Sequence, residues 1–195
     1  THSNSYRMEV RKWMLALAVA FCSISAASSK PSTDTGTPRI SDMINVQERL
    51  YIKWRNYNWT TNRCHSATKN SGSGDHYEIT LRVRPRRWEH LYLYKTNLTT
   101  LSTHGDQEHN AAIYRLGPGY PEVVRELIYS DPGRGCFILK ESLEANKTGC
   151  QLLQTESTID NGVPRGCKKA YETNCSFVKF KLYNWYCKFI PDIIR

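Results

Sequence analysis

Six cysteines in the C-terminal two thirds of the chain constrain its fold more than any other feature of the sequence. The chain has 195 residues and seven cysteines, and the seventh, Cys22, lies in an apolar stretch near the N-terminus. An even set of six in a secreted chain predicts three disulfides, although six cysteines permit about 15 pairings. The sequence has no Cys-x-x-Cys pair and no histidine at zinc-ligand spacing, so we expect no metal site and no cofactor. The six are Cys64, Cys136, Cys150, Cys167, Cys175 and Cys187.

Residues 8–27 have the pattern of a secretory signal peptide. Arg11 and Lys12 give a positive start, a mostly apolar run follows, and Ser25 and Ala27 supply the small residues of a cleavage site. The apolar run is too short for a membrane span, which takes about 20 residues. The sequence therefore predicts a secreted, extracellular protein with no membrane span.

The signal peptide divides the rest of the chain. Residues 1–7 precede the first methionine and are interpreted as an upstream extension. Residues 28–39 are rich in Ser, Thr, Pro and Gly and are interpreted as a flexible leader. Residues 40–195 are expected to form one domain and a monomer, and Cys22 leaves with the signal peptide.

Four Asn-x-Ser/Thr sequons agree with secretion and predict N-glycosylation. Modified asparagines must lie on the surface, so the sequons also predict exposed turns. One of them directly precedes Cys175, where early disulfide formation would hinder modification. The sequons are at Asn58, Asn97, Asn146 and Asn174.

The expected domain is rich in short strands separated by turn residues. In residues 76–83 apolar and polar side chains alternate, which is typical of a half-buried strand. Pro164 predicts the start of a helix over 165–175, and a shorter helix is expected within 40–48. The other expected strands are residues 49–57, 91–101, 111–116, 123–130, 136–140, 150–159 and part of 177–190. About eight strands in meander order fit an up-and-down barrel or a β-sandwich, and their spacing does not separate the two.

The chain is basic, with 27 Lys and Arg against 18 Asp and Glu. A secreted chain without a recognisable nucleic-acid module is not expected to bind nucleic acid. The cluster Arg-Val-Arg-Pro-Arg-Arg at residues 82–87 predicts either a patch for a heparin-like glycan or a host protein, or a charged edge strand protected from aggregation. No nucleophile motif or catalytic carboxylate pair is recognisable, so no catalytic residue is assigned and no enzymatic activity is predicted.

Several short motifs, in matching order, resemble those of the tick salivary lipocalins, the family that includes the histamine-binding proteins. The resemblance covers residues 40–190 and rests on an aromatic strand followed by Trp and Cys, a Tyr-Ser-Asp turn before a Cys, and a Val-Pro-x-x-Cys helix start. These motifs are residues 51–57, Trp59, Cys64, Tyr129-Ser130-Asp131, Cys136 and Val163-Pro164-Arg165-Gly166-Cys167. The resemblance implies an all-β fold, an eight-stranded up-and-down antiparallel lipocalin barrel with a short N-terminal helix and a C-terminal helix.

The resemblance also implies a disulfide pairing and a function. Cys64 would pair with Cys187, Cys136 with Cys167, and the remaining two cysteines with each other as an extra bridge. The implied function is that of a protein in tick saliva that sequesters a small host inflammatory mediator, a biogenic amine such as histamine, and so serves immune evasion.

The residues that hold an amine in this family are largely replaced here. The amine signature is an Asp after the Cys and then a Glu-Leu-aromatic strand, at which positions this chain has Phe137, Gln151 and Leu153. An Asp expected near the N-terminus is also lost, close to Tyr57. The expected ligand-binding residues are Trp54, Tyr57, Trp59, Phe137, Gln151 and Leu153.

Two kinds of ligand follow from these replacements. An amine requires another acid that points into the barrel, because a buried ammonium must be compensated. Alternatively the pocket holds a lipid mediator such as a leukotriene or fatty acid, with its carboxylate on a basic side chain. The candidate acids are Glu78, Glu89, Glu122, Glu126 and Glu141, and the candidate bases are Lys53, Arg55, Arg82 and Arg84. Alternation places Arg82 and Arg84 on the outer face.

Overall fold

The computed structural model describes residues 38–85, 90–105 and 108–193. The expected upstream extension and signal peptide, and most of the expected leader, lie outside these residues. The helices are α1 (Ile40–Ile44) and α2 (Arg165–Asn174), with short 3-10 helices η1 (Pro132–Arg134), η2 (Glu144–Asn146) and η3 (Trp185–Lys188). The strands are β1 (Leu50–Arg55), β2 (Arg63–Ser73), β3 (His76–Arg84), β4 (Tyr92–Leu101), β5 (Ala111–Arg115), β6 (Glu122–Asp131), β7 (Cys136–Ser142), β8 (Thr148–Thr155) and β9 (Phe180–Lys181).

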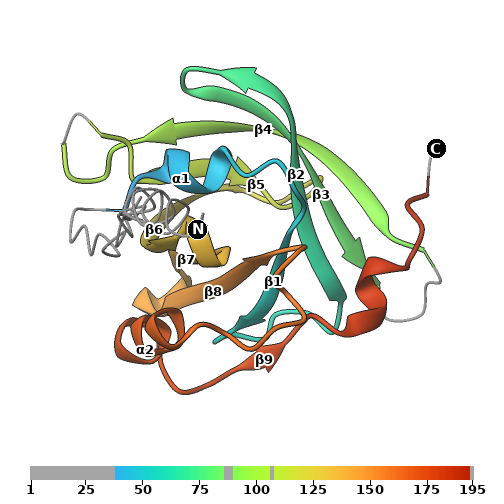
Figure 1. The fold of residues 1–195 in the computed structure, drawn as a ribbon. Coiled ribbons are helices and arrows are strands. Elements are labelled where there is room, and N and C mark those ends of the chain that lie inside the picture. Colours follow the sequence, from blue (N-terminus) through green and yellow to red (C-terminus); the bar gives the residue numbers. More distant parts are fainter. Residues whose placement is uncertain (1–37, 86–89, 106–107, 194–195) are drawn as a thin grey trace, which may run out of the picture. The chain divides into compact units, whose positions relative to one another are not determined.

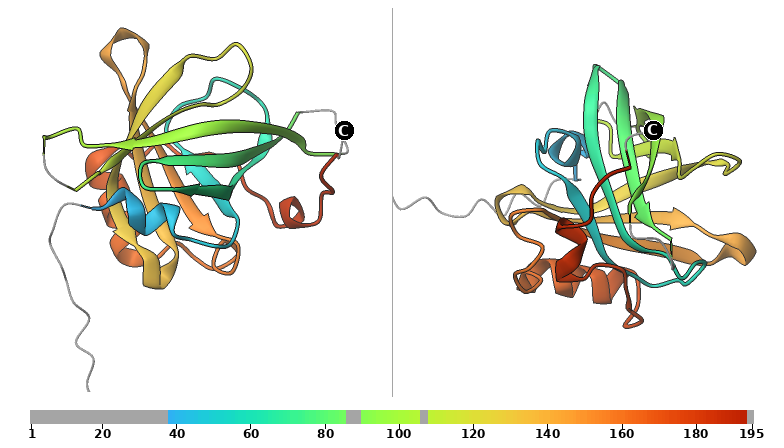
Figure 2. Two further views of the ribbon diagram at one scale, coloured as in Figure 1. Left: turned by 90° about the horizontal axis from the view of Figure 1, so that it is seen from above. Right: turned by 90° about the vertical axis from the view of Figure 1, so that its right-hand side faces the viewer.

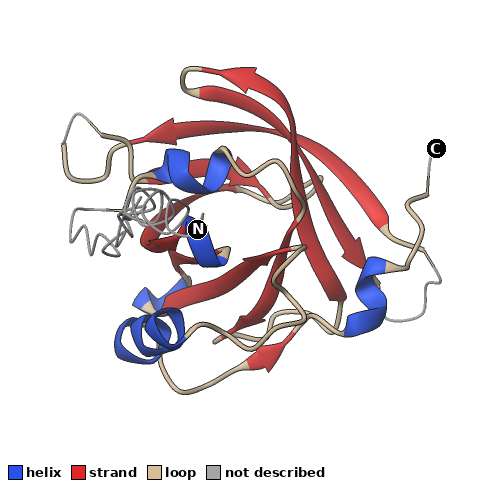
Figure 3. Ribbon diagram, in the orientation of Figure 1, coloured by secondary structure: helices blue, strands red, loops and turns tan. Residues whose placement is uncertain are grey.

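The strands form one closed antiparallel sheet. Each strand from β2 to β8 pairs with the next along the chain, and β1 pairs with both β8 and β2. The result is an eight-stranded up-and-down barrel, seen as a ring of strands in Figures 1 and 3. The fold that the resemblance implied is confirmed, and the β-sandwich alternative is wrong.

The sequence did not predict one of the barrel strands. Residues 63–73 form β2, yet only Cys64 and Ser66 among them are buried, because the strand is made of small and polar residues. The far end of β2 and the start of β3 are exposed, and this hairpin projects from the barrel (Figure 2, right). Conversely, the tail expected as the eighth strand provides only the two residues of β9 and then η3.

The β1 strand is irregular, and the irregularity decides which side chains face the interior. Leu50 and Ile52 line the interior, whereas Lys53 lies outside and donates to the carbonyl groups of residues 159 and 161. The pairing of β1 with β8 shifts by one residue between Ile52 and Trp54. Trp54 therefore also points outward, onto Tyr171 of α2, and Arg55 points inward.

The pairing of β1 with β2 covers only two residue pairs, Leu50 with Ala67 and Tyr51 with Ser66. Beyond them β9 takes the place beside β1, opposite Trp54 and Arg55. The amide of Cys64 then donates to the carbonyl of Leu182 at 2.9 Å. We call this place the β1–β2 seam, and the C-terminal tail completes its hydrogen bonding.

Buried residues form three clusters around the barrel wall. The first fills the end of the interior that α1 covers, where Ile40, Met43 and Ile44 pack against residues such as Phe137 and Leu139. The second lies outside β1 and β2, beneath the tail, and the third lies between β7, β8 and α2. Figure 1 shows α2 on the outside of the ring, next to β8.

Three disulfides join the outer clusters. Cys64 pairs with Cys187, Cys136 with Cys167, and Cys150 with Cys175, as the resemblance implied. The first ties the seam to the tail, and the other two hold α2 and its C-terminal end on the barrel.

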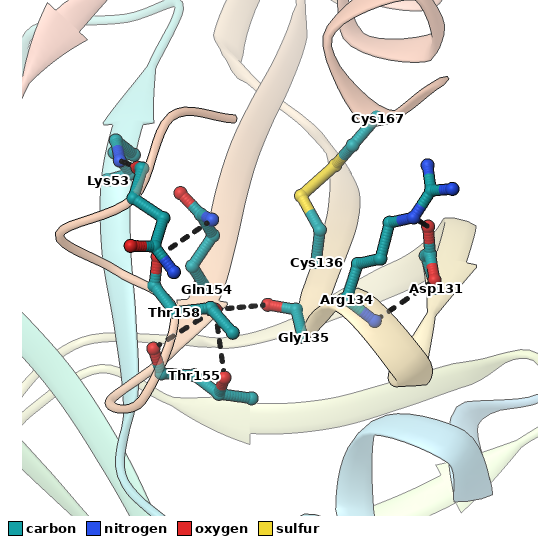
Figure 4. The surroundings of a disulfide bond; sticks show 10 residues. Lys53, Asp131, Arg134, Gly135, Cys136, Gln154, Thr155, Thr158 and Cys167 are labelled. Atoms are coloured by element: carbon teal, nitrogen blue, oxygen red, sulfur yellow. Dashed lines mark hydrogen bonds and ion pairs between the residues drawn. A yellow bond between two sulfur atoms is a disulfide. The ribbon is translucent and has the colours of Figure 1, made fainter. Parts of the chain in front are cut away.

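Gly135 precedes the second disulfide and requires glycine. Its φ of 59° is left-handed, and an added Cβ would collide with the hydroxyl of Thr155. Its carbonyl accepts from the amide of Thr155 at 3.0 Å and from the hydroxyl of Thr158 at 3.4 Å (Figure 4). This glycine therefore connects the start of β7 with the turn that follows β8.

Removal of the Cys64–Cys187 disulfide is expected to destabilise the barrel more than removal of Cys150–Cys175. The two bridges join residues 123 and 25 positions apart. The chain-entropy model then gives losses of about 5 and about 3.5 kcal/mol for the two double Cys→Ser variants. Urea denaturation monitored by circular dichroism measures both. An equal or larger loss in the Cys150→Ser/Cys175→Ser variant would contradict a special role of the seam.

Candidate ligand-binding cavity

The barrel encloses a cavity of about 300 Å³ at the end opposite α1. Its walls are apolar and aromatic side chains such as Ile52, Leu81 and Tyr94. The β1–β2 and β5–β6 loops bring Trp59 and Tyr120 to the mouth, where both are largely exposed. A second cavity of about 60 Å³ lies against α1 and shares Leu50, Ala67, Tyr114 and Leu153 with the larger one.

A buried polar network adjoins the larger cavity, whose lining includes one of its members, Gln151. Arg125 of β6 forms an ion pair with Glu141 of β7, with 2.9 Å between Nε and Oε2, and both side chains are 1% exposed. The other Glu141 oxygen accepts from the hydroxyl of Tyr57 and, at 2.9 Å, from the amide of Gln151. The Gln151 amide also donates to the Tyr57 hydroxyl at 2.6 Å.

This network neutralises the carboxylate. Burial, with the nearby Glu141 charge, raises the pKa of the Tyr57 hydroxyl, so this group stays protonated and donates. The Arg125 guanidinium lies 4.3 Å from the centre of the Tyr114 ring, and one of its nitrogens donates to two backbone carbonyls of the wall. Glu141 is thus compensated by groups of the protein itself.

Arg55 is the second buried cation of this wall, and it differs from Arg125. Its side chain is 4% exposed and lies over the Tyr57 ring, with 4.8 Å between the guanidinium carbon and the ring centre. Its guanidinium donates to the carbonyl of Thr60 at 3.4 Å. No carboxylate of the described residues lies within ion-pair distance of it, and burial lowers its pKa.

Two buried polar atoms of the cavity lining, Arg55 Nε and His65 Nε2, have no hydrogen-bond partner in the described part of the chain. The buried Ser66 hydroxyl also lacks one there, but Ser66 is paired in register with Tyr51 and Arg82 and shares their outer face. Burial, with the charge of Arg55, lowers the pKa of His65 to about 3, so its ring is neutral at physiological pH. The guanidinium of Arg55 is thus the donor that this wall presents to a ligand, since the neutral His65 ring already donates to the backbone of Asn62 and its other nitrogen is an acceptor.

Of the five acids considered for an amine site, the described chain places only Glu141 inside the barrel. Glu78 accepts from Asn70 and faces Lys95, Glu122 pairs with Arg115, and Glu126 lies 3.1 Å from a ring nitrogen of His104. All these contacts are on the outer surface. Glu89 lies outside the described residues.

Of the four basic candidates, Arg55 alone points into the cavity. Lys53 is outside, as described above, and Arg82 forms an ion pair with Asp192 at 2.9 Å on the outer face. Arg84 lies over the ring of Tyr186 in η3, with 5.4 Å to the ring centre.

The expected ligand-binding residues separate into three groups. Gln151 and Leu153 line the larger cavity, and Trp59 lies at its mouth with its ring 4.7 Å from that of Tyr57. Tyr57 belongs to the network, and Phe137 to the cluster under α1. Trp54 lies outside, against Tyr171.

Sequence reasoning missed Arg125 and His65. Arg125 stands between Val123 and Leu127 on one face of β6, and this alternation would have placed it inside. The pairing with Glu141 had no such signal, because it depends on the register between two strands. His65 follows Cys64 in the strand that the sequence analysis did not recognise.

Several other expectations concern the surface. The four sequon asparagines, Asn58, Asn97, Asn146 and Asn174, are all exposed. No helix in the described ranges is long and apolar enough to cross a membrane. In the same ranges no three His, Cys, Asp or Glu side chains are grouped in a way that would hold a metal ion.

Several solved structures have a similar fold. Japanin from Rhipicephalus appendiculatus bound to cholesterol has 12% identity and a TM-score of 0.51, over 71% of this chain and 95% of japanin. AM182 in a serotonin complex has 13% identity and a TM-score of 0.57, over 78% and 94% of the two chains. The cockroach allergen Per a 4 has 12% identity and a TM-score of 0.56, over 79% and 96%. No match was found among curated protein sequences.

A closed up-and-down barrel of eight strands, with a cavity inside, a short helix at one end and a second helix on the outside, defines the protein as a lipocalin. The family model described as tick histamine binding protein matches residues 37–189. The chain belongs to the tick histamine-binding protein family. Lipocalins of this family are ligand-binding carriers, and three disulfides are typical of extracellular proteins.

The substitution Glu141→Gln is expected to destabilise the protein by about 3–5 kcal/mol, because it leaves Arg125 buried without a counter-charge. The double variant Glu141→Gln/Arg125→Met removes both charges and is expected to recover most of this loss. Urea denaturation at neutral pH measures both values. A single variant as stable as the double variant would contradict the ion pair.

His65 is expected to make the protein less stable in acid. Its pKa is about 3 in the folded chain and 6.5 without this environment, so between these values the unfolded chain binds a proton that the folded chain does not. Stability is therefore lost as the pH falls from about 6.5 towards about 3. His65→Gln is expected to lose less stability than the wild type between pH 7 and pH 4.5, measured by urea denaturation. The exposed His90 provides the control, since His90→Gln should behave like the wild type.

Proposed function

We propose that the protein is a secreted carrier that sequesters a small apolar ligand bearing a carboxylate, such as a fatty acid or a related lipid mediator of the host. Arg55 is the observation that carries this proposal. Around the larger cavity, Arg125 and Arg82 each pair with a carboxylate, and Arg55 does not. A buried cation without a counter-charge costs several kcal/mol, and a ligand carboxylate would offset this cost.

The cavity lining supports the same ligand class. A carboxylate accepts hydrogen bonds from a guanidinium, and Arg55 Nε is a buried donor of the cavity lining without a partner in the described chain. The remaining wall is mostly apolar, with Ile52 and Leu81 among its side chains. Its volume of about 300 Å³ lies at the lower end of the range for small-molecule sites, ~300–1,000 Å³.

A biogenic amine fits this cavity less well. An ammonium group needs a carboxylate that is not already neutralised. Glu141, the one candidate acid inside the barrel among the described residues, already holds Arg125, Tyr57 and Gln151. The similar structures contain cholesterol in one case and serotonin in another, so this barrel accommodates different chemistries in different proteins.

Secretion and host defence complete the proposal. The sequence of residues 8–27 supports export, and the three disulfides are consistent with an oxidising compartment. A carrier that removes a lipid mediator from host tissue would dampen the response that this mediator triggers.

Calorimetric titration with oleate, methyl oleate, histamine and serotonin tests the ligand class. Oleate is expected to bind more tightly than its uncharged methyl ester, and both more tightly than either amine. Arg55→Met should weaken oleate binding by about 10- to 100-fold, the worth of hydrogen bonds to a charged group, and leave the ester unchanged.

Lys140→Met is the matched control, because Lys140 lies exposed on β7 and the substitution removes the same charge. Equal weakening by the two variants would indicate a general charge effect. Tight histamine binding that survives in Arg55→Met would overturn the proposal in favour of an amine carrier.

A further inference from the structure

His65 presents to the larger cavity a hydrogen-bond acceptor that a carboxylate does not satisfy. Its ring donates to the backbone of Asn62 and is neutral, so the other nitrogen, Nε2, has a lone pair to offer. This atom is buried and has no partner in the described part of the chain. An ionised carboxylate brings only acceptors, and two acceptors do not bond to each other.

The local backbone fixes the position of this ring. Cys64, the preceding residue, belongs to the outer cluster beneath the tail, so alternation along β2 places His65 on the cavity side. Cys64 has a left-handed backbone with a φ of 56°, which residues other than glycine rarely adopt. Its disulfide with Cys187 and its amide hydrogen bond to Leu182 hold it in this conformation. The position of His65 therefore depends on the tail that completes the β1–β2 seam.

Arg55 and His65 lie near each other in the cavity wall. The guanidinium of Arg55 donates to the carbonyl of Thr60, and the His65 ring donates to the backbone two residues further on, at Asn62. The charge of Arg55 also acts on the imidazole and helps to lower its pKa. A donor, Arg55 Nε, and an acceptor, His65 Nε2, are thus held over one short segment, and neither has a partner in the described chain.

A ligand that fills the cavity excludes water from this wall. An acceptor that is kept from both water and protein donors is costly to leave unpaired. A plain fatty acid has no donor for it once its carboxylate is ionised. A ligand that supplies its own donor therefore has an advantage in this cavity.

We infer that the ligand carries a hydroxyl group close to its carboxylate, and that this hydroxyl donates to Nε2 of His65 while the carboxylate accepts from Arg55. The inference rests on the function proposed above and narrows its ligand class to apolar hydroxy acids. A hydroxyl is a donor without charge, so it places no second cation beside Arg55. An ammonium group would also donate to Nε2, but the guanidinium would repel it.

Calorimetric titration with three acids of equal chain length tests the inference. The wild type is expected to bind β-hydroxydodecanoate about 3- to 10-fold more tightly than dodecanoate, which is the worth of one neutral hydrogen bond. The third acid, ω-hydroxydodecanoate, has its hydroxyl at the far end of the chain. It should gain nothing, because the rest of the wall is mostly apolar.

Two variants of His65 separate the acceptor from the shape of the ring. His65→Phe keeps a ring and removes the acceptor, so the preference for β-hydroxydodecanoate should disappear while dodecanoate still binds. His65→Gln retains a side-chain carbonyl as an acceptor and should keep part of the preference. The matched control is His90→Phe, at an exposed histidine that does not line the cavity, and it should keep all of the preference.

Nitrogen NMR of the wild-type imidazole gives a readout that needs no variant. The Nε2 resonance of His65 should move in the direction of a hydrogen-bonded acceptor when β-hydroxydodecanoate binds. Dodecanoate should not cause this change.

The outcomes distinguish this inference from the proposed function. Equal affinity of the wild type for β-hydroxydodecanoate and dodecanoate would overturn the inference and leave the carboxylate site in place. An equal gain from the ω-hydroxyl, or a preference that persists in His65→Phe, would also overturn it, because the hydroxyl would then bind another group. Failure to bind any of the three acids would overturn the proposed function together with the inference.

Discussion

The barrel depends on the double pairing of β1. A sheet of eight strands becomes a closed barrel only when its first strand bonds on both edges, and β1 bonds β8 along one side and β2, then β9, along the other. Without the contribution of the tail, the backbone groups of residues 53–55 on this side would lack strand partners. The Cys64–Cys187 disulfide lies at the same place, so a covalent bond and backbone hydrogen bonds together hold the tail at the β1–β2 seam and keep the barrel closed.

Because the barrel is closed, a charged side chain in its interior is removed from water and needs a counter-charge or hydrogen bonds to compensate it. Glu141 and Arg125 neutralise each other there, and Tyr57 and Gln151 donate to the other oxygen of the carboxylate. Arg55 is held by an aromatic face and one carbonyl. The family scaffold is therefore retained, and the sign of the available interior charge is the reverse of what an ammonium ligand needs.

The fold could be predicted from the sequence, whereas the arrangement of side chains in the cavity could not. Motif order and cysteine spacing led to the lipocalin barrel and its three disulfides, because these features are carried by local residue patterns. The orientation of Trp54 and Arg55 was not available, since a one-residue shift in β1 reverses inside and outside. β2 lacks the alternation that marks a strand, and the approach of Glu141 to Arg125 depends on packing between distant residues.

The arrangement at the seam also has a consequence for biosynthesis. β1 leaves the ribosome early, yet the segments that complete its second edge, β9 and the residues up to Cys187, are translated last. Contacts between residues so far apart in sequence slow folding, since the loop between them must first be ordered. The first strand therefore lacks most of its partners until β8 and the tail have been translated, and an unpaired strand edge of this kind is prone to aggregation.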